Sequence, residues 1–182
     1  MTAMRGHAPI VVGIDGTQAQ TVPLAWALDE AASRKLPVRV VHALVEGLDA
    51  AVNGVACGDP GGAAVRHALG FAREHAPDVA LSAALRSGPP IRTLLAEGAE
   101  ATLLVVGSHF PGAPAGLLSG STGLELGARA PCPVVVVRGA PRTTPLRRVV
   151  VGVDGSEEAA RAVEFAFGEA SLHGCGLSAV HA

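Results

Sequence analysis

The sequence predicts an α/β fold, in which a doubly wound, Rossmann-like sheet of five parallel strands is followed by a partial second copy of the same unit. Short apolar runs alternate with longer helix-like stretches along the whole chain, as expected when strands and helices alternate. Hydrophobic residues make up 49% of the chain but aromatic residues only 3%, so Val, Leu, Ile and Ala must fill the core. That composition is typical of a buried parallel sheet covered by Ala-rich helices.

The opening of the chain is repeated later in the sequence. Val11 to Gly16 returns as Val150 to Gly155, and the short stretch around His42 returns around His181, both at the same separation of 139 residues (15 to 154, 42 to 181). A constant separation across an intervening helical pattern indicates a repeated folding unit. We therefore expect one domain, a linker rich in Pro and Arg, and the first β-α-β unit of an incomplete second domain, at residues 1–140, 141–148 and 149–182.

The expected elements follow one another with short turns. The first strand, residues 10–14, is an apolar run that ends at Asp15-Gly16. The first helix spans residues 21–35, with Thr21 placed to cap it and Pro23 in its first turn, where a missing N–H costs little. The remaining strands are expected at 38–44, 79–85, 103–106, 134–137, 149–153 and 177–181, and the remaining helices at 60–74, 90–99, 121–130 and 157–173.

The order of the strands in the sheet can also be predicted. Right-handed crossovers leave few arrangements for five parallel strands. The strand at 79–85 is the least apolar and is expected at an edge, with the first and fourth strands adjacent in the middle, which gives the order 3-2-1-4-5. The order changes direction between the first and fourth strands, so we expect a ligand crevice outside their carboxyl ends.

Charge, hydropathy and cysteine content exclude several classes of partner. The formal net charge is −2, without a basic run or an aromatic stripe, so nucleic acid is not expected as a partner. No segment approaches the roughly 18 uninterrupted apolar residues of a membrane span, and no apolar stretch before Ile10 suggests a signal peptide. The three cysteines show no Cys-x-x-Cys spacing, and this favours a reduced, cytoplasmic location.

Two loops should converge on the expected crevice. The first holds Asp15-Gly16-Thr17; the second runs from Gly107 to Gly120 and is long against the usual length of about 4 to 6 residues. Its glycines let backbone amides approach a ligand, and the helix that starts at Ser121 and Thr122 offers unpaired N–H groups and a partial positive charge. This combination favours the binding of phosphate.

These residues resemble the motifs of the universal stress protein family, whose nucleotide-binding members carry Gly-x-x-Gly-x9-Gly-(Ser/Thr). The matching stretches are Gly107-Ser108-His109, the nine residues Pro111 to Ser119, Gly120-Ser121, Ala130 to Val137, the opening at Asp15 and the Gly88-x-Pro90 turn. The resemblance covers residues 9–138, and the part after Leu146 looks like a second domain of a tandem member. It implies a regulatory stress-response module that binds ATP or a related adenine nucleotide.

The resemblance also implies roles for individual residues. Asp15 and Ala43 would face the adenosine, with Val106 and Gly107 beside it.

The phosphate half of the site is implied in the same way. Gly120, Ser121 and Thr122 would hold the phosphates, with Mg²⁺ as an optional companion, and Gly112 matches a glycine that many members have. Phe110 stands where the motif has its second glycine, and we expect this departure to weaken ATP binding.

Structural interpretations of the same residues stay open. Asp15 could simply cap a turn, as Asp-Gly pairs do, and Ser121 and Thr122 could cap a helix. His42 and His181 are expected to be structural, because no second ligand sits at a metal-binding spacing.

The main alternative function is a structural or interaction domain of the same fold that has lost its ligand, and Phe110 favours it. An oxidoreductase would need the dinucleotide fingerprint after the first strand, and a phospho-receiver an acceptor aspartate after the third; neither is present. No nucleophile with its base is recognisable, so we expect no enzyme activity beyond slow ATP hydrolysis.

The strand at Val134 to Val137 predicts an association. It is wholly apolar and expected at a sheet edge, where unpaired N–H and C=O groups lie beside hydrophobic side chains. We expect a homodimer in which this strand meets its counterpart in another chain.

Overall fold

The computed structural model describes residues 8–44, 60–108, 121–139 and 148–181. The chain forms two compact units, Met1–Pro141 and Arg142–Ala182. Among the described residues, no helix combines the length and the apolar character that crossing a bilayer requires.

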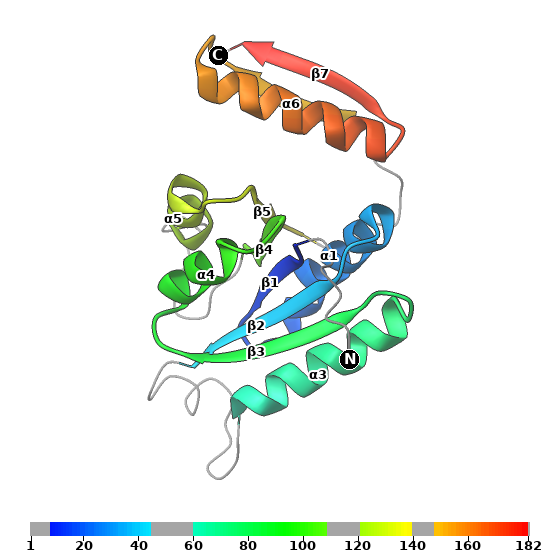
Figure 1. Cartoon of the computed structure of the whole chain (residues 1–182), viewed down its shortest axis with the longest axis vertical. Helices are drawn as coiled ribbons and strands as arrows, with labels where there is room; N and C mark the ends of the chain where they lie inside the picture. The colour runs from blue at the N-terminus through cyan, green and yellow to red at the C-terminus, as the bar shows by residue number, and fades with distance from the viewer. Residues whose placement is uncertain (1–7, 45–59, 109–120, 140–147, 182) are drawn as a thin grey trace. The chain divides into compact units, whose positions relative to one another are not determined.

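The first unit is built on one sheet of five parallel strands in the order β3-β2-β1-β4-β5 (Figure 1). The predicted fold class and strand order are therefore confirmed. The central strands β1 and β4 are buried on both faces, which explains their unbroken apolar sequences. The five strands are β1 (Ile10–Ile14), β2 (Val38–Leu44), β3 (Leu81–Ser87), β4 (Leu103–Gly107) and β5 (Val134–Val137).

Helices cover both faces of this sheet (Figure 1). On one face, α1 and α3 pack against alternate residues of β1, β2 and β4 and form the larger core cluster. On the other face, α4 and α5 place Leu94 and Leu126 in a second cluster with Val11 and Val41. The helical elements are η1 (Gln18–Gln20, a 3-10 turn), α1 (Thr21–Arg34), α3 (Pro60–His75), α4 (Pro90–Gly98) and α5 (Ser121–Arg129).

The sequence of α1 accounts for its place under the sheet. Leu24, Ala27, Leu28 and Ala31 recur at the spacing of one helix face, and all four are fully buried. The helix ends at Arg34, and the next residue, Lys35, takes the left-handed conformation with φ of 55°, so the chain can turn back into β2.

Two local predictions need correction. Thr21 does not cap α1: it is the first residue of the helix, and its hydroxyl donates to the Gln18 carbonyl at 2.9 Å. The 3-10 turn η1 comes directly before α1, so the chain becomes helical at Gln18 and not at Thr21. The third strand was expected at 79–85 but spans Leu81–Ser87; it begins two residues later because Pro77 and Asp78 form a turn, and it ends two residues later.

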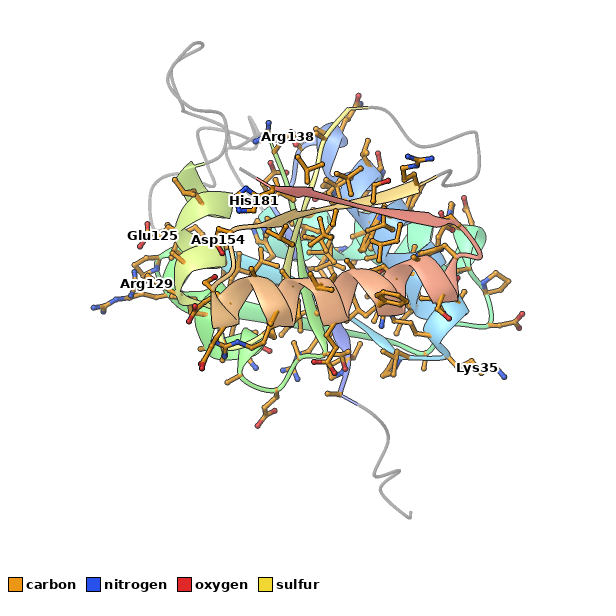
Figure 2. The ribbon with its side chains drawn as sticks, turned by 90° about the horizontal axis from the view of Figure 1, so that it is seen from above. Lys35, Glu125, Arg129, Arg138, Asp154 and His181 are labelled. Atoms are coloured by element: carbon orange, nitrogen blue, oxygen red, sulfur yellow. The ribbon has the colours of Figure 1, made fainter. Side chains whose placement is uncertain are left out.

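The second unit contains one β-α-β arrangement, β6 (Arg148–Val153), α6 (Glu157–Leu172) and β7 (Gly176–His181). β6 and β7 are parallel, and Val153 pairs with His181 just as Ile14 pairs with His42 in the first unit. Asp154 and His181 consequently lie together at the carboxyl end of this two-stranded sheet (Figure 2). The repeat seen in the sequence is thus a repeat of structure with the same strand register.

Candidate functional site

The strands β1 and β4 separate at their carboxyl ends. Their ladder stops at the pair Val12 and Val105. Beyond this pair, β1 continues beside β2 up to Ile14, while β4 continues beside β5 up to Gly107. The two loops that follow therefore leave the sheet at the point where the strand order changes direction, which is the predicted position for a ligand in a doubly wound sheet.

The loop after β1 is held by its own aspartate. The Asp15 carboxylate accepts two hydrogen bonds on Oδ1, from the Thr17 amide at 2.9 Å and the Thr17 hydroxyl at 2.8 Å. Gly16 lies between them with φ of 83°, a conformation that favours glycine. Asp15 therefore caps the turn, as the structural interpretation of the sequence predicted. Neither of these two bonds uses its second carboxylate oxygen, Oδ2.

A third bond holds the same loop from the side. The Gly16 amide donates to Oε1 of Gln20 at 2.9 Å, and Nε2 of Gln20 lies 3.5 Å from Nδ1 of His67 on α3. Gln20 is only 3% exposed, so its side chain belongs to the interior beside the loop. Gln20 was not among the predicted site residues, although a polar residue at an interior position four residues after the Asp-Gly turn is a signal that the sequence contains.

Two close contacts bring α1 and α4 to the place between β1 and β4 where the strand order changes direction. A Cβ atom on Gly13 would lie 3.0 Å from both Cδ atoms of Leu94, so the glycine lets α4 pack closely on β1. A Cβ atom on Gly107 would lie 3.4 Å from Cγ of Pro23, which places the first turn of α1 beside the end of β4. The predicted residues Val106 and Gly107 therefore lie at the end of the sheet where the Asp15 loop begins.

Glu97 fixes the position of α4. Its carboxylate lies 3.0 Å from Nε of Arg39 on β2 and 2.7 Å from Nε of Arg86 on β3. The glutamate side chain is 11% exposed, so these ion pairs are better shielded from water than ordinary surface pairs. They tie the helix that carries Leu94 to the two neighbouring strands β2 and β3.

The end of β2 lies next to the start of α3. A Cβ on Gly61 would come within 2.3 Å of Leu44 and 3.2 Å of the His42 ring. His42 is buried, and its Nδ1 lies 3.0 Å from the carbonyl oxygen of Ile14, its partner in the ladder. Burial and the contact with the backbone of β1 are typical of a histidine with a structural role. Ala43 follows it, paired with Arg86 one position beyond the end of β1.

The start of α5 lies at the same end of the sheet. A Cβ on Gly123 would come within 2.6 Å of Cγ2 of Val136, and Val136 is paired with Val106. Thr122 is half-buried in this first turn, and α5 begins at Ser121 as predicted. The structure therefore brings Asp15, Ala43, Val106, Gly107 and Thr122 to one end of the sheet. The other predicted residues, Gly112 and Gly120, and the departure at Phe110 lie outside the described residues.

The second unit contains another copy of the aspartate turn. The Asp154 carboxylate accepts from the Ser156 hydroxyl at 2.6 Å and from the Ser156 amide at 2.9 Å, and Gly155 has φ of 85°. The hydroxyl bond, followed by the amide bond, holds the pKa of Asp154 below its ordinary value. The turn thus has the same geometry in both units.

Comparison with known proteins identifies relatives along the whole chain. The model of the family described as "Universal stress protein family" matches residues 7–138 and 145–182. Universal stress protein Rv2005c of Mycobacterium tuberculosis (strain ATCC 25618 / H37Rv) is 34% identical over 197 residues; the match covers 100% of this chain and 66% of that protein. The chain thus spans about two thirds of the length of the curated relatives that it matches.

Solved structures match the same fold. A universal stress protein in complex with cAMP has a TM-score of 0.56 at 25% identity, covering 72% of this chain and 97% of its own. A putative universal stress protein from Pseudomonas aeruginosa UCBPP-PA14 has a TM-score of 0.68 at 20% identity, covering 99% of this chain and 63% of its own. The second match supports the fold of both units.

Proposed function

This chain belongs to the universal stress protein family, and we propose that it is a regulatory stress-response module whose first unit binds ATP or a related adenine nucleotide. The observation that carries the proposal is the separation of β1 and β4 beside the ordered Asp15 turn, at the strand ends where doubly wound sheets bind ligands. A relative 25% identical to this chain was solved in complex with cAMP, an adenine nucleotide, which supports the same ligand class here.

In this proposal some of the described residues bind the adenosine and others bind the phosphates. The Asp15 carboxylate and the backbone at Ala43 hold the adenosine, while Val106 and Gly107 lie beside it. Thr122 and the amides at the start of α5 hold the phosphates, with Gly112, Gly120 and Ser121 as further candidates and Mg²⁺ as an optional companion.

Thermal unfolding with and without nucleotide tests the proposal. A ligand that binds only the folded state at a hundredfold excess over Kd stabilises it by about 2.7 kcal/mol, so millimolar ATP, ADP or AMP should raise the Tm by several degrees. Asp15→Asn keeps an acceptor oxygen for Thr17 but removes the charge, and it should weaken this shift. Asp78→Asn, the same change in the exposed turn before β3, should leave the shift intact.

An unchanged Tm in all three nucleotides would favour the second candidate function, a structural or interaction domain without a ligand. Phe110 in place of a motif glycine is the observation that supports it. Detection of nucleotide released from the denatured, purified protein would decide for the first.

We also propose that the module is not an enzyme beyond slow ATP hydrolysis. Phosphate release from ATP at saturating concentration should stay close to the rate in buffer. Multiple turnovers within minutes would contradict this.

The association of two chains through β5 is part of the same proposal. β5 is an edge strand, with β4 on its one paired side, and its Val134–Val137 sequence is wholly apolar. Light scattering at micromolar concentration should give the mass of a dimer, and Val135→Lys or Val136→Lys, whichever faces the partner, should shift it to a monomer while the circular dichroism spectrum keeps its shape. A monodisperse wild-type monomer would contradict the dimer.

We propose, finally, that residues 149–182 begin a second domain of the same family, in a tandem arrangement. The family match at residues 145–182 and the shared strand register support this. Residues 149–182 alone should then be less resistant to protease than residues 1–140 alone, because they contain one β-α-β unit and not a covered sheet. Equal resistance would show that they form a complete small domain.

A further inference from the structure

Gln20 is a polar residue at a position where an apolar one would be expected. It is 3% exposed, and the neighbouring interior positions of η1 and α1 carry Pro23 and Leu24. A buried amide costs free energy unless it is hydrogen-bonded. Its bond from the Gly16 amide at 2.9 Å is short, whereas the 3.5 Å approach to His67 is long for a hydrogen bond. The main partner of Gln20 is therefore the backbone of the Asp15 loop.

The second unit shows that the aspartate turn forms without this bond. Position 159 is equivalent to position 20 and carries alanine, yet Asp154 and Ser156 make the same two bonds as Asp15 and Thr17. There, the Ser156 hydroxyl also accepts from the Ala159 amide at 3.1 Å and caps α6 directly. The aspartate turn therefore does not need Gln20 in order to form.

The 3-10 turn explains how Gln20 reaches Gly16. In the first unit, η1 stands between Thr17 and α1, and Thr17 makes no capping bond with its side chain. The extra turn brings residue 20 back towards the loop, so that its amide oxygen meets the Gly16 N–H. This arrangement is present only in the unit that carries the proposed site.

We infer that Gln20 is a positioning residue for the nucleotide site, which fixes the direction in which the Asp15 turn presents its carboxylate. The inference rests on the proposed function. Gly16 is the flexible link of the turn, and fixing its amide lowers the conformational entropy that nucleotide binding would otherwise cost. Through His67 the same side chain also lies against α3, so the loop is aligned with the helix that covers the end of β2.

Two variants of Gln20 separate positioning from packing. Gln20→Met keeps a similar volume but has no oxygen, while Gln20→Glu keeps an oxygen that can accept the Gly16 N–H. In the full chain without ligand, the Gly16 amide should exchange with deuterium at least severalfold faster in Gln20→Met and at the wild-type rate in Gln20→Glu. Gln18→Met, the same change at an exposed position of the same 3-10 turn, is the matched control and should leave the rate unchanged.

Calorimetric titration with AMP and ATP completes the test. The loss of one net hydrogen bond should weaken binding to Gln20→Met about fivefold, with Gln18→Met at the wild-type affinity. Equal affinities of Gln20→Met and wild type, with Gly16 exchange unchanged, would overturn the inference while the proposed function stands. Wild-type protein that binds neither nucleotide would overturn the proposed function itself, and the inference with it.

Discussion

Val11 and Val150 occupy equivalent positions on the first strands of the two β-α-β units, yet Val11 is 1% exposed and Val150 is 63% exposed. The same contrast appears on the second strands, where Val41 is 1% exposed and Val180 is 53% exposed. In the first unit these valines lie in one cluster with Leu94 of α4 and Leu126 of α5. We call the face of the strands that carries Val11 and Val41, and the equivalent face with Val150 and Val180, the outer face. In the described part of the second unit, α6 covers one face, and no element of that unit covers the other.

The comparison separates what a β-α-β unit determines by itself from what its surroundings add. The strand register and the aspartate turn are the same in both units, so they do not depend on helices that cover both faces of the strands. Among the described residues, burial of the outer face and the bond that the Gly16 amide donates to Gln20 occur only in the first unit. Local sequence therefore builds the frame of the site, and contacts with distant parts of the chain stabilise it.

The largest effect is expected from a charge placed on the outer face of each unit. Val11→Asp buries an unpaired carboxylate and should destabilise the first unit by more than about 4 kcal/mol. Val150→Asp should change stability by less than about 0.5 kcal/mol, because its side chain is already in water. The single tryptophan, Trp26, reports urea unfolding of the first unit, and hydrogen exchange in β6 reports on the second. Equal losses in the two variants would refute the contrast.

A smaller effect is expected at a pair of equivalent glycines. A Cβ on Gly13 would lie 3.0 Å from Leu94, which is itself buried, whereas a Cβ on Gly152 would meet nothing within 4 Å. Gly13→Ala should therefore cost roughly 1 kcal/mol or more through overpacking, measured by Trp26 fluorescence in urea.

Gly152→Ala is the matched control in the second unit. It should be neutral or slightly stabilising in hydrogen exchange of β6, since alanine suits a strand better than glycine. A loss of stability as large as that of Gly13→Ala would mean that the outer face of β6 is covered.

The smallest effect concerns the pH dependence of the turn in the second unit. The folded-state pKa of Asp154 is lowered, so its bonds stabilise the folded state above the unfolded pKa and are lost as pH falls through the folded value. NMR titration of the Asp154 carboxyl should thus give a midpoint below the ordinary value of about 3.9.

Removal of the donor hydroxyl tests the cause of this shift. Ser156→Ala should move the Asp154 midpoint upward, because the Ser156 hydroxyl is the largest contribution to the lowered pKa. Ser171→Ala, on the same helix, should leave the midpoint in place. A midpoint that does not respond to Ser156→Ala would show that the turn does not hold the carboxylate as described.

The fold was predictable because its strands are short apolar runs with clear ends. The apolar run at 134–137 has the predicted bounds, and the less apolar third strand indicated the sheet edge. The start of that strand was wrong by two residues, since Val79 is apolar but belongs to the turn at Pro77 and Asp78.

The candidate site was predictable only in part. Asp15 directly follows one buried strand and Gly107 ends another, so both positions could be predicted, and the structure brings them to one end of the sheet. The part played by Gln20 depends on the 3-10 turn that aims its side chain, and periodicity does not reveal such a turn. The roles of all the predicted site residues in ligand binding stay predictions, and Gly112 and Gly120 also lie outside the described residues.

The register shared by the two units bears on how the chain folds during synthesis. In the described part of the second unit, β6 and β7 keep their alignment with α6 as the one helix that covers them, so we expect residues 10–44 to align β1 with β2 before the rest of the chain is made. Val11 and Val41 would then face water until Leu94 and Leu126 have been translated. During that interval the nascent chain presents an apolar surface of the kind that molecular chaperones recognise, and the length of the interval is set by the distance in sequence between β2 and α5.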